Sequence, residues 1–358
     1  MNTDSHGDSL EKSAGQRYSN HEMDRGRGYT DQDGYRQLVD SSSQGIFFCH
    51  RWWLDTVCPG EYEILTVEAN GQVQAAWPVV WRKRWGLRWI AMPALTQKLG
   101  ILFAPSEAKY AERLSREHRL AEALIAQLPG GTRIASHNFH ETFESWLPFH
   151  WVGFQQTTRY TYILEDTSDL ELIWHGLRPA VRKDIRKSEK AGIRVRETED
   201  LQKFYHVESL TFRRQSLANP VPFGLLERVY AACKANANVR MTVAEDEQGR
   251  AHAVLFAIFD SRCMVLLMSG GDPELRGDAA NTLLHWDAIQ FGSSVCRRFD
   301  FEGSMMKSIE QFYRGFGARL TPYSSISGVL GTKPAGWLRR RAGEVLHRIG
   351  DFVGRRRL

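Results

Sequence analysis

A short stretch near the C-terminal end of the sequence carries two acidic side chains, Asp300 and Glu302, interleaved with Phe299 and Phe301. Because side chains alternate along a strand, the two carboxylates would share one face, roughly 6.5–7 Å apart. Two carboxylates so close raise the pKa of one of them, and a raised pKa suits a general base working near neutral pH. We therefore expect a catalytic role for one of this pair. The alternative is that both face solvent, or that one of them pairs with Arg297 or Arg298.

A turn just before this stretch could hold an anion. An apolar run that ends at Met268 meets Gly270 and Gly271, and a helix is expected to begin near Asp278 or Ala279. Free backbone N–H groups at a helix start can bind a pyrophosphate or another anion. The glycine spacing matches neither the Walker A nor the Rossmann pattern, and Asp278 would equally serve as an ordinary N-cap. The turn alone is therefore a weak signal.

The helix expected over residues 176–192 carries cations at four-residue spacing, namely Arg178, Arg182, Arg186 and Lys190. Like charges at this spacing destabilise a helix, so the stripe favours an anionic partner such as a phosphate, a nucleic-acid end or a lipid head group. The alternative is a solvated face. On the next expected helix, His206 and Glu208 are candidates for an acceptor pocket.

The elements that must position these residues alternate between strands and helices, which indicates a mixed α/β fold. Asn70-Gly71 predicts a hairpin. We expect further strands at 87–92, 98–103, 132–137, 239–260 and 262–270, and helices at 111–128, 201–215 and 278–292. A segment around 134–154 resembles 299–318 in its order of a strand, an aromatic helix and a closing glycine, which is compatible with either a duplication or chance.

The chain has 358 residues, enough for two domains. We divide it into a disordered arm over 1–44, a first domain over 45–155, a second over 156–330 and a tail over 331–358. From residue 333 onward the sequence contains eight Lys or Arg and two Asp or Glu, which gives this segment a net charge of +6. Because the whole chain has a net charge of +5, the residues before it sum to −1. The tail reads as a basic amphipathic helix suited to an anionic membrane or RNA, or alternatively as a helix packed on the body.

Several classes of protein are disfavoured. The five cysteines are scattered and the histidines show no metal-ligand spacing, so we expect a reducing compartment and no metal. A Gly-x-Ser-x-Gly elbow is absent from the sequence, which disfavours a covalent hydrolase. No apolar run is long enough for a secretion signal or a membrane span. These features predict a soluble, cytoplasmic protein.

Several stretches together resemble the GNAT acyltransferases, specifically the FemAB-like or BioF2-like acetyltransferase group with tandem GNAT domains. The resemblance covers about residues 46 to 330. It rests on residues 52–57, 92–100, 159–164, 181–195, 265–289 and 299–318. It implies two tandem GNAT-like domains, the first degenerate.

The resemblance also implies that an amine attacks an activated acyl donor directly. The pyrophosphate of an acetyl-CoA or other acyl-CoA co-substrate would lie at Ser269, Gly270, Arg276, Gly277, Asp278, Ala279, Ala280 and Asn281. Tyr313 would protonate the leaving group, and Asp300 or Glu302 would accept the amine proton. Backbone N–H groups near residues 267–269 would polarise the acyl carbonyl.

The sequence departs from the family pattern at two glycine positions, which Ala279 and Asn281 occupy. This departure fits the FemAB side, where the donor can be an aminoacyl-tRNA. The stretch around Asp300 is also similar to leucyl/phenylalanyl-tRNA-protein transferase, with Glu302 where that family has Gln.

Three functions remain open. The first is an N-acyltransferase that moves an acyl group from acyl-CoA to an amine on a cell-envelope or polysaccharide precursor, either a small molecule or a lipid-linked one. The second is a FemAB-like transferase that uses aminoacyl-tRNA. The third is a non-catalytic scaffold of envelope biosynthesis. The basic helix and tail would bring tRNA or the inner face of a membrane close, so a peripheral location is an alternative to a purely cytoplasmic one.

Overall fold

The computed structural model describes residues 34–213, 218–303 and 305–331. The fold begins earlier than expected, because helix α1 (Tyr35–Ser41) buries Tyr35, Leu38 and Val39. Residues 35–44 therefore pack on the body and do not belong to a disordered arm. The predicted C-terminal amphipathic helix lies outside the described residues. Within the described ranges, no helix is both long and apolar enough to cross a membrane.

The described strands form one mixed sheet, in the order β1-β2-β3-β5-β12-β6-β11-β10-β9-β8-β7, with β4 paired to β2. In chain order the strands are β1 (Tyr62–Ala69), β2 (Gln72–Arg84), β3 (Leu87–Ile90), β4 (Leu102–Phe103), β5 (Arg133–Asn138), β6 (Gln155–Leu164), β7 (Arg194–Glu197), β8 (Asn238–Glu245), β9 (Ala251–Phe259), β10 (Cys263–Gly271), β11 (Arg298–Asp300) and β12 (Arg319–Val329).

Buried apolar side chains form three cores between the helices and the sheet. One core joins α1 and α2 of the first half to α7 and α8 of the second, a second lies under α5, α6 and α9, and a third lies under α3 and α4. The remaining helices are α2 (Arg51–Val57), α3 (Tyr110–Ile125), α4 (Leu147–Trp151), α5 (Leu170–Gly176), α6 (Pro179–Lys190), α7 (Leu201–Arg213), α8 (Phe223–Asn236), α9 (Ala280–Val295) and α10 (Lys307–Arg314), with short 3-10 turns η1 (Phe47–Cys49) and η2 (Arg276–Asp278). The expectation of a mixed α/β fold is confirmed.

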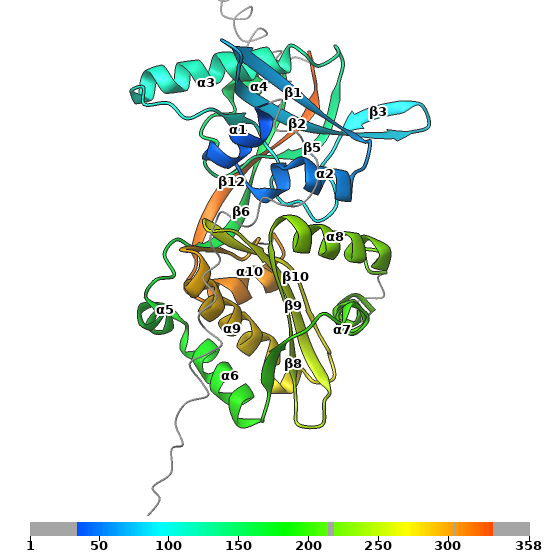
Figure 1. Ribbon diagram of the computed structural model, residues 1–358, viewed down its shortest axis with the longest axis vertical. Helices are drawn as coiled ribbons and strands as arrows, with labels where there is room; N and C mark the ends of the chain where they lie inside the picture. The colour runs from blue at the N-terminus through cyan, green and yellow to red at the C-terminus, as the bar shows by residue number, and fades with distance from the viewer. Residues whose placement is uncertain (1–33, 214–217, 304, 332–358) are drawn as a thin grey trace, which may run out of the picture.

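Strands β6 and β12 connect the two halves of the molecule (Figure 1). The chain order strand, helix, strand occurs twice, as β5-α4-β6 and as β11-α10-β12. Strand β12, from the end of the described chain, pairs with β5 of the first half as well as with β6, while β6 pairs with β11 of the second half. Side chains from the first half can therefore reach the strands that carry the expected site.

Candidate active site

The site begins where two parallel strands part. Strands β10 and β11 pair only from Cys263↔Arg298 to Val265↔Asp300, and β10 then continues to Gly271 without β11. The pairing of β10 with β9 shifts register between Leu266 and Met268, so the intervening residue has no partner across that ladder. Such a bulge bends the strand and redirects its backbone groups. The edge of β10 that faced β11 is thus open from Leu266 onward.

A cavity of about 480 Å³ lies beside the open end of β10, between the start of α9 and helix α10. Six of the eight residues expected to bind a donor line it, namely Ser269, Gly270, Arg276, Ala279, Ala280 and Asn281. Gly277 and Asp278 are not among the lining residues. Instead, their carbonyl oxygens accept hydrogen bonds from Lys187 and Ser188 of α6.

The start of α9 has no side-chain cap. Ala279 is the N-cap residue, in the left-handed conformation at φ 56°, and its methyl group cannot accept a hydrogen bond. Asp278 is therefore not the N-cap, so the alternative interpretation of this turn is wrong. An uncapped helix start that borders a cavity presents free N–H groups and the positive end of the helix dipole. This geometry suits a phosphate-bearing ligand.

Tyr313 and His285 are among the residues that line this cavity. Burial raises the pKa of the Tyr313 phenol, the charge of Glu302 raises it further, and a hydrogen bond with Ser269 acts against both. His285 is fully buried, and its Nδ1–H donates to the carbonyl of Asn281 at 2.8 Å, which leaves Nε2 as an acceptor without a partner. Burial lowers the pKa of His285 to about 4, so the ring is neutral at pH 7. Sequence reasoning missed this residue, whose only local signal is its position four residues after Asn281.

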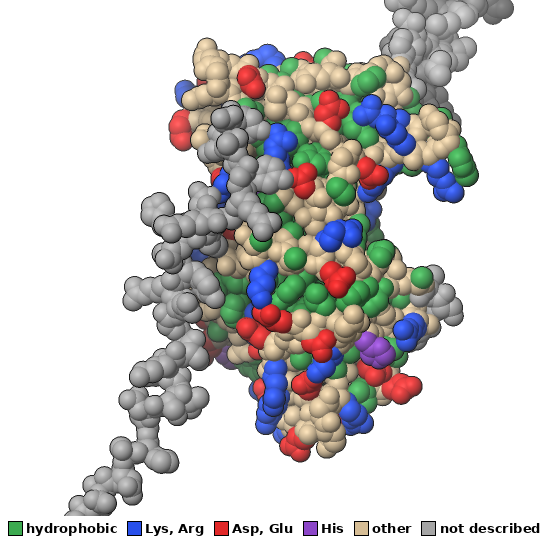
Figure 2. Space-filling model, turned by 45° about the vertical axis from the view of Figure 1, so that its right-hand side comes forward, with side chains coloured by type: hydrophobic (Ala, Val, Ile, Leu, Met, Phe, Trp, Pro, Cys, Tyr) green, Lys and Arg blue, Asp and Glu red, His purple; other side chains and the backbone are tan. Residues whose placement is uncertain are grey.

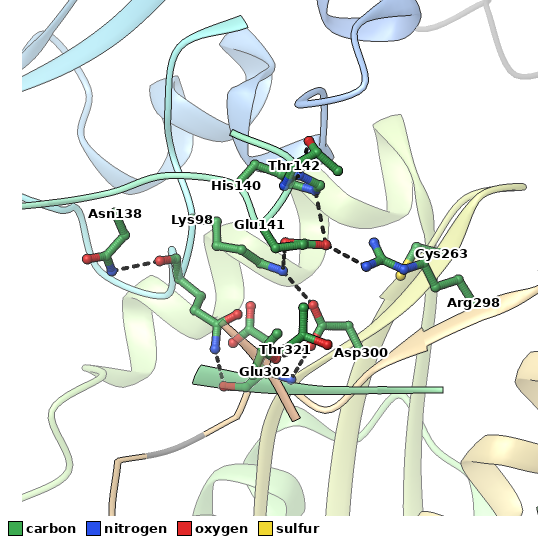
Figure 3. Close-up of polar contacts among 12 residues, drawn as sticks. Lys98, Asn138, His140, Glu141, Thr142, Cys263, Arg298, Asp300, Glu302 and Thr321 are labelled. Carbon is green, nitrogen blue, oxygen red and sulfur yellow. Dashed lines mark hydrogen bonds and ion pairs between the residues drawn. The ribbon is translucent and has the colours of Figure 1, made fainter. Parts of the chain in front are cut away.

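The two carboxylates do not share a strand face as expected. Strand β11 ends at Asp300, and Glu302 lies beyond it with a positive φ of 54°, which breaks the alternation. The Asp300 carboxylate is buried and accepts hydrogen bonds from Lys98 Nζ at 2.6 Å, from the Thr161 hydroxyl and from the Glu302 backbone N–H at 2.8 Å (Figure 3). Asp300 is therefore engaged in the interior of the protein.

Lys98 is the centre of an ion network that crosses between the halves (Figure 3). Its Nζ lies 2.6 Å from Asp300 and 2.8 Å from Glu141, and Glu141 in turn lies 2.6 Å from Arg298. Burial alone would lower the pKa of Lys98, but the two carboxylates together raise it above its ordinary value. Sequence reasoning placed Lys98 in a strand and missed both it and Glu141, because neither belongs to a local motif.

Glu302, unlike Asp300, has a carboxylate oxygen that no other side chain occupies, so this oxygen can accept a proton or a hydrogen bond from a ligand. Burial raises its pKa well above the ordinary value, the neighbouring Asp300 charge adds to the shift, and Lys98 opposes it. Its Oε1 is buried without a hydrogen-bond partner, while its backbone carbonyl accepts from the Gln97 amide. A carboxylate of this kind is a stronger base than an exposed one when it is ionised.

The cationic side chains of α6 that were expected to bind an anion make different contacts from one another. Arg182 donates to the carbonyls of Trp174 at 3.1 Å and His175 at 3.0 Å, so it caps the C-terminal end of α5. Arg186 stacks over Trp174 at 5.5 Å. Arg178 and Lys190 are exposed, as is His206 on α7, and none of these side chains lines the cavity.

Comparison with known proteins identifies part of the chain. Residues 176–307 match the family model described as an acetyltransferase (GNAT) domain. No curated protein matches the sequence. Among solved structures, FemX is 13% identical with a TM-score of 0.64 and covers 85% of this chain and 97% of its own.

Two further structures share the fold over the same length. A tandem GNAT protein from the clavulanic acid biosynthesis pathway is 12% identical with a TM-score of 0.50, covering 86% of this chain and 98% of its own. A conserved protein of unknown function from Bacteroides thetaiotaomicron VPI-5482 is 10% identical with a TM-score of 0.53, covering 86% and 99%.

Proposed function

The chain carries a GNAT acetyltransferase domain within the tandem fold of FemAB-like acyltransferases, and from this premise we propose that it transfers an acyl group from an acyl-CoA thioester to an amine. The observation that carries the proposal is the cavity at the uncapped start of α9, which is lined both by Arg276 and by Tyr313. One end of such a cavity suits phosphates, and the other holds a proton donor beside the parted strands.

The residues present can perform the transfer without a covalent enzyme intermediate. The amine nitrogen attacks the acyl carbonyl carbon, a C–N bond forms and the C–S bond breaks. The Glu302 carboxylate accepts a proton from the nitrogen, and the Tyr313 hydroxyl donates one to the departing thiolate. Backbone N–H groups released at the bulge near Leu267 stabilise the oxyanion. The acceptor that we propose is an amine on a cell-envelope or polysaccharide precursor.

An aminoacyl-tRNA donor is the second candidate. Ala279 and Asn281 replace the glycines of the acyl-CoA pattern, and the exposed Arg178 and Lys190 would contact a nucleic-acid backbone. On the face in Figure 2, basic and acidic side chains are interspersed. We prefer the acyl-CoA donor because the matching family model is an acetyltransferase (GNAT) domain. A scaffold without activity is the third alternative.

We also propose a peripheral membrane location, supported by the β2–β3 hairpin, which extends away from the body (Figure 1). Trp85 is 85% exposed and Leu87 69% exposed at its tip, beside the exposed cations Lys83, Arg84 and Arg88. Aromatic side chains flanked by cations suit the interface of an anionic bilayer.

The test is the melting temperature of the purified protein with CoA, acetyl-CoA or bulk aminoacyl-tRNA. A ligand at a hundred times its Kd adds about 2.7 kcal/mol of stability, which gives a measurable shift. We expect a shift with both CoA species that Arg276→Ala abolishes and that Arg119→Ala, an exposed change on α3, leaves intact. A shift with tRNA alone would transfer the proposal to the second candidate, and no shift with any ligand would favour the scaffold.

A further inference from the structure

The free carboxylate belongs to a set of buried polar atoms that have no hydrogen-bond partner. Among the described residues, seven buried side-chain nitrogen or oxygen atoms have no hydrogen-bond partner, and Glu302 Oε1, Gln97 Oε1 and Arg159 Nε are three of them. Burying an unpaired polar group costs free energy, so several together at one place indicate a missing partner. Two of these atoms accept hydrogen bonds and the third donates.

The strand geometry places Arg159 on the face of β6 that Asp300 approaches. The Thr161 hydroxyl on β6 reaches Asp300, so this face of β6 points toward that carboxylate. Arg159 lies two residues earlier and shares that face. Opposite it on β12 stands Tyr323, just as Thr321 stands opposite Thr161.

The loop that carries Glu302 runs along β6, because the Phe301 N–H donates to the Tyr162 carbonyl at 3.0 Å. A side chain at the next residue, Gly303, has no room, because its Cβ would collide with the Cα of Thr161 and the carbonyl oxygen of Tyr160. The Gln97 amide joins the group from the first half by donating to the Glu302 carbonyl. Figure 3 shows Glu302 beside Thr321 and Asp300. We call the place where the loop carrying Glu302 meets the paired strands β6 and β12 the seam. Both halves of the chain therefore contribute polar groups to this region.

Arg159 is a half-buried cation that lacks a counter-ion. Its side chain contacts the Tyr323 hydroxyl, and no ion pair joins it to a carboxylate within the ranges that the structure describes. The nearby Asp300 is already paired with Lys98. A partly desolvated guanidinium is stabilised by an oxyanion, which it binds through charge-assisted hydrogen bonds.

We propose that this seam binds the amine acceptor and that the acceptor carries an acidic group, a carboxylate or a phosphate, close to its amine. Glu302 and Gln97 would accept hydrogen bonds from the amino group, and Arg159 would donate to the oxyanion. This inference rests on the proposed acyl transfer, because it assigns the second substrate of the same reaction.

Matched pairs of amines test the inference. Glucosamine 6-phosphate and glucosamine differ by a phosphate, and β-alanine and β-alaninamide differ by a carboxylate charge. Binding is measured by titration calorimetry, and transfer by release of CoA from acetyl-CoA. We expect the acidic member of at least one pair to be preferred by about 10- to 100-fold, the range that a charge-assisted hydrogen bond provides.

Substitutions at Arg159 test whether this residue causes the preference for the acidic amine. Arg159→Gln should remove the preference, Arg159→Lys should retain part of it, and Arg133→Gln, an exposed change on β5, should leave it intact. The ratio within a pair is insensitive to partial loss of folded protein. The pair that discriminates also identifies the oxyanion as phosphate or carboxylate.

The outcomes separate this inference from the proposed function. Transfer without discrimination, or discrimination that survives Arg159→Gln, overturns the inference and leaves acyl transfer standing. Discriminating binding that depends on Arg159, without any transfer, supports the acceptor site and contradicts the proposed reaction. If neither pair discriminates in binding or in transfer, the inference is wrong.

Discussion

Lys98 and Asp300 are 202 positions apart in the sequence, yet Lys98 Nζ lies 2.6 Å from the Asp300 carboxylate in the interior of the protein. The contact joins the first half of the chain to the end of β11. Because the Asp300 carboxylate also accepts a hydrogen bond from the Glu302 backbone N–H, the first half helps to position Glu302, which we propose as the general base.

The first prediction concerns this pair. Lys98→Met leaves the carboxylates of Asp300 and Glu141 buried without their cation, so it should lower the free energy of unfolding by about 3–5 kcal/mol. Urea denaturation measures the change, and Lys83→Met, at an exposed position, is the control. A loss for Lys98→Met no larger than that of the control would show that the pair does not hold the halves together.

The resemblance between 134–154 and 299–318 was visible in the sequence, and the hairpin at Asn70-Gly71 formed as predicted, because both depend on local signals. The Lys98 network was not visible, since its partners meet only when β12 and β6 join the halves. The site prediction also assumed strand alternation through Glu302. Its left-handed backbone could not be foreseen, because no local motif around Glu302 indicates a positive φ.

The second prediction concerns pH and Glu302. Its pKa is higher in the folded protein than in the unfolded chain, so the folded state holds the proton more tightly. That contribution to stability is complete below the ordinary pKa and is lost as the pH rises toward the folded value. Glu302→Gln should therefore gain stability relative to the wild type between pH 5 and pH 8. Urea melts at the two pH values measure this gain, and an unchanged difference would contradict the raised pKa.

The third prediction concerns Tyr313. Removing its hydroxyl in Tyr313→Phe should reduce kcat by about 10²- to 10⁴-fold, the contribution of a general acid, while the KM for the donor stays nearly constant. Steady-state CoA release measures both quantities. Tyr160→Phe, on β6 and outside the cavity lining, is the matched control. Equal kcat values for the two variants would remove Tyr313 from the mechanism.

The fourth prediction concerns His285, whose Nε2 is an unpaired acceptor in the cavity wall. The ring packs among Phe301 and Phe312, so His285→Phe fits the apolar surroundings and should change stability by less than about 1.5 kcal/mol. It should weaken donor binding, because the acceptor is lost. Donor Kd measured by calorimetry checks this, and an unchanged Kd would limit His285 to packing.

The fifth prediction concerns the β2–β3 hairpin. Replacing both Trp85 and Leu87 by Ser should release the protein from vesicles that contain anionic phosphatidylglycerol, without changing its melting temperature. Cosedimentation at low and high salt measures the binding. Identical binding by the variant and the wild type would exclude this hairpin as a membrane contact.

Binding of CoA to the cavity between β10, α9 and α10 tests the central proposal most directly. Isothermal titration of CoA into the wild type should give saturable binding, and Ser308→Trp, which places a large ring at the cavity wall, should abolish it with the melting temperature preserved. Absence of binding to the wild type, or equal affinity in the Ser308→Trp variant, would contradict the assignment of this cavity to the acyl donor.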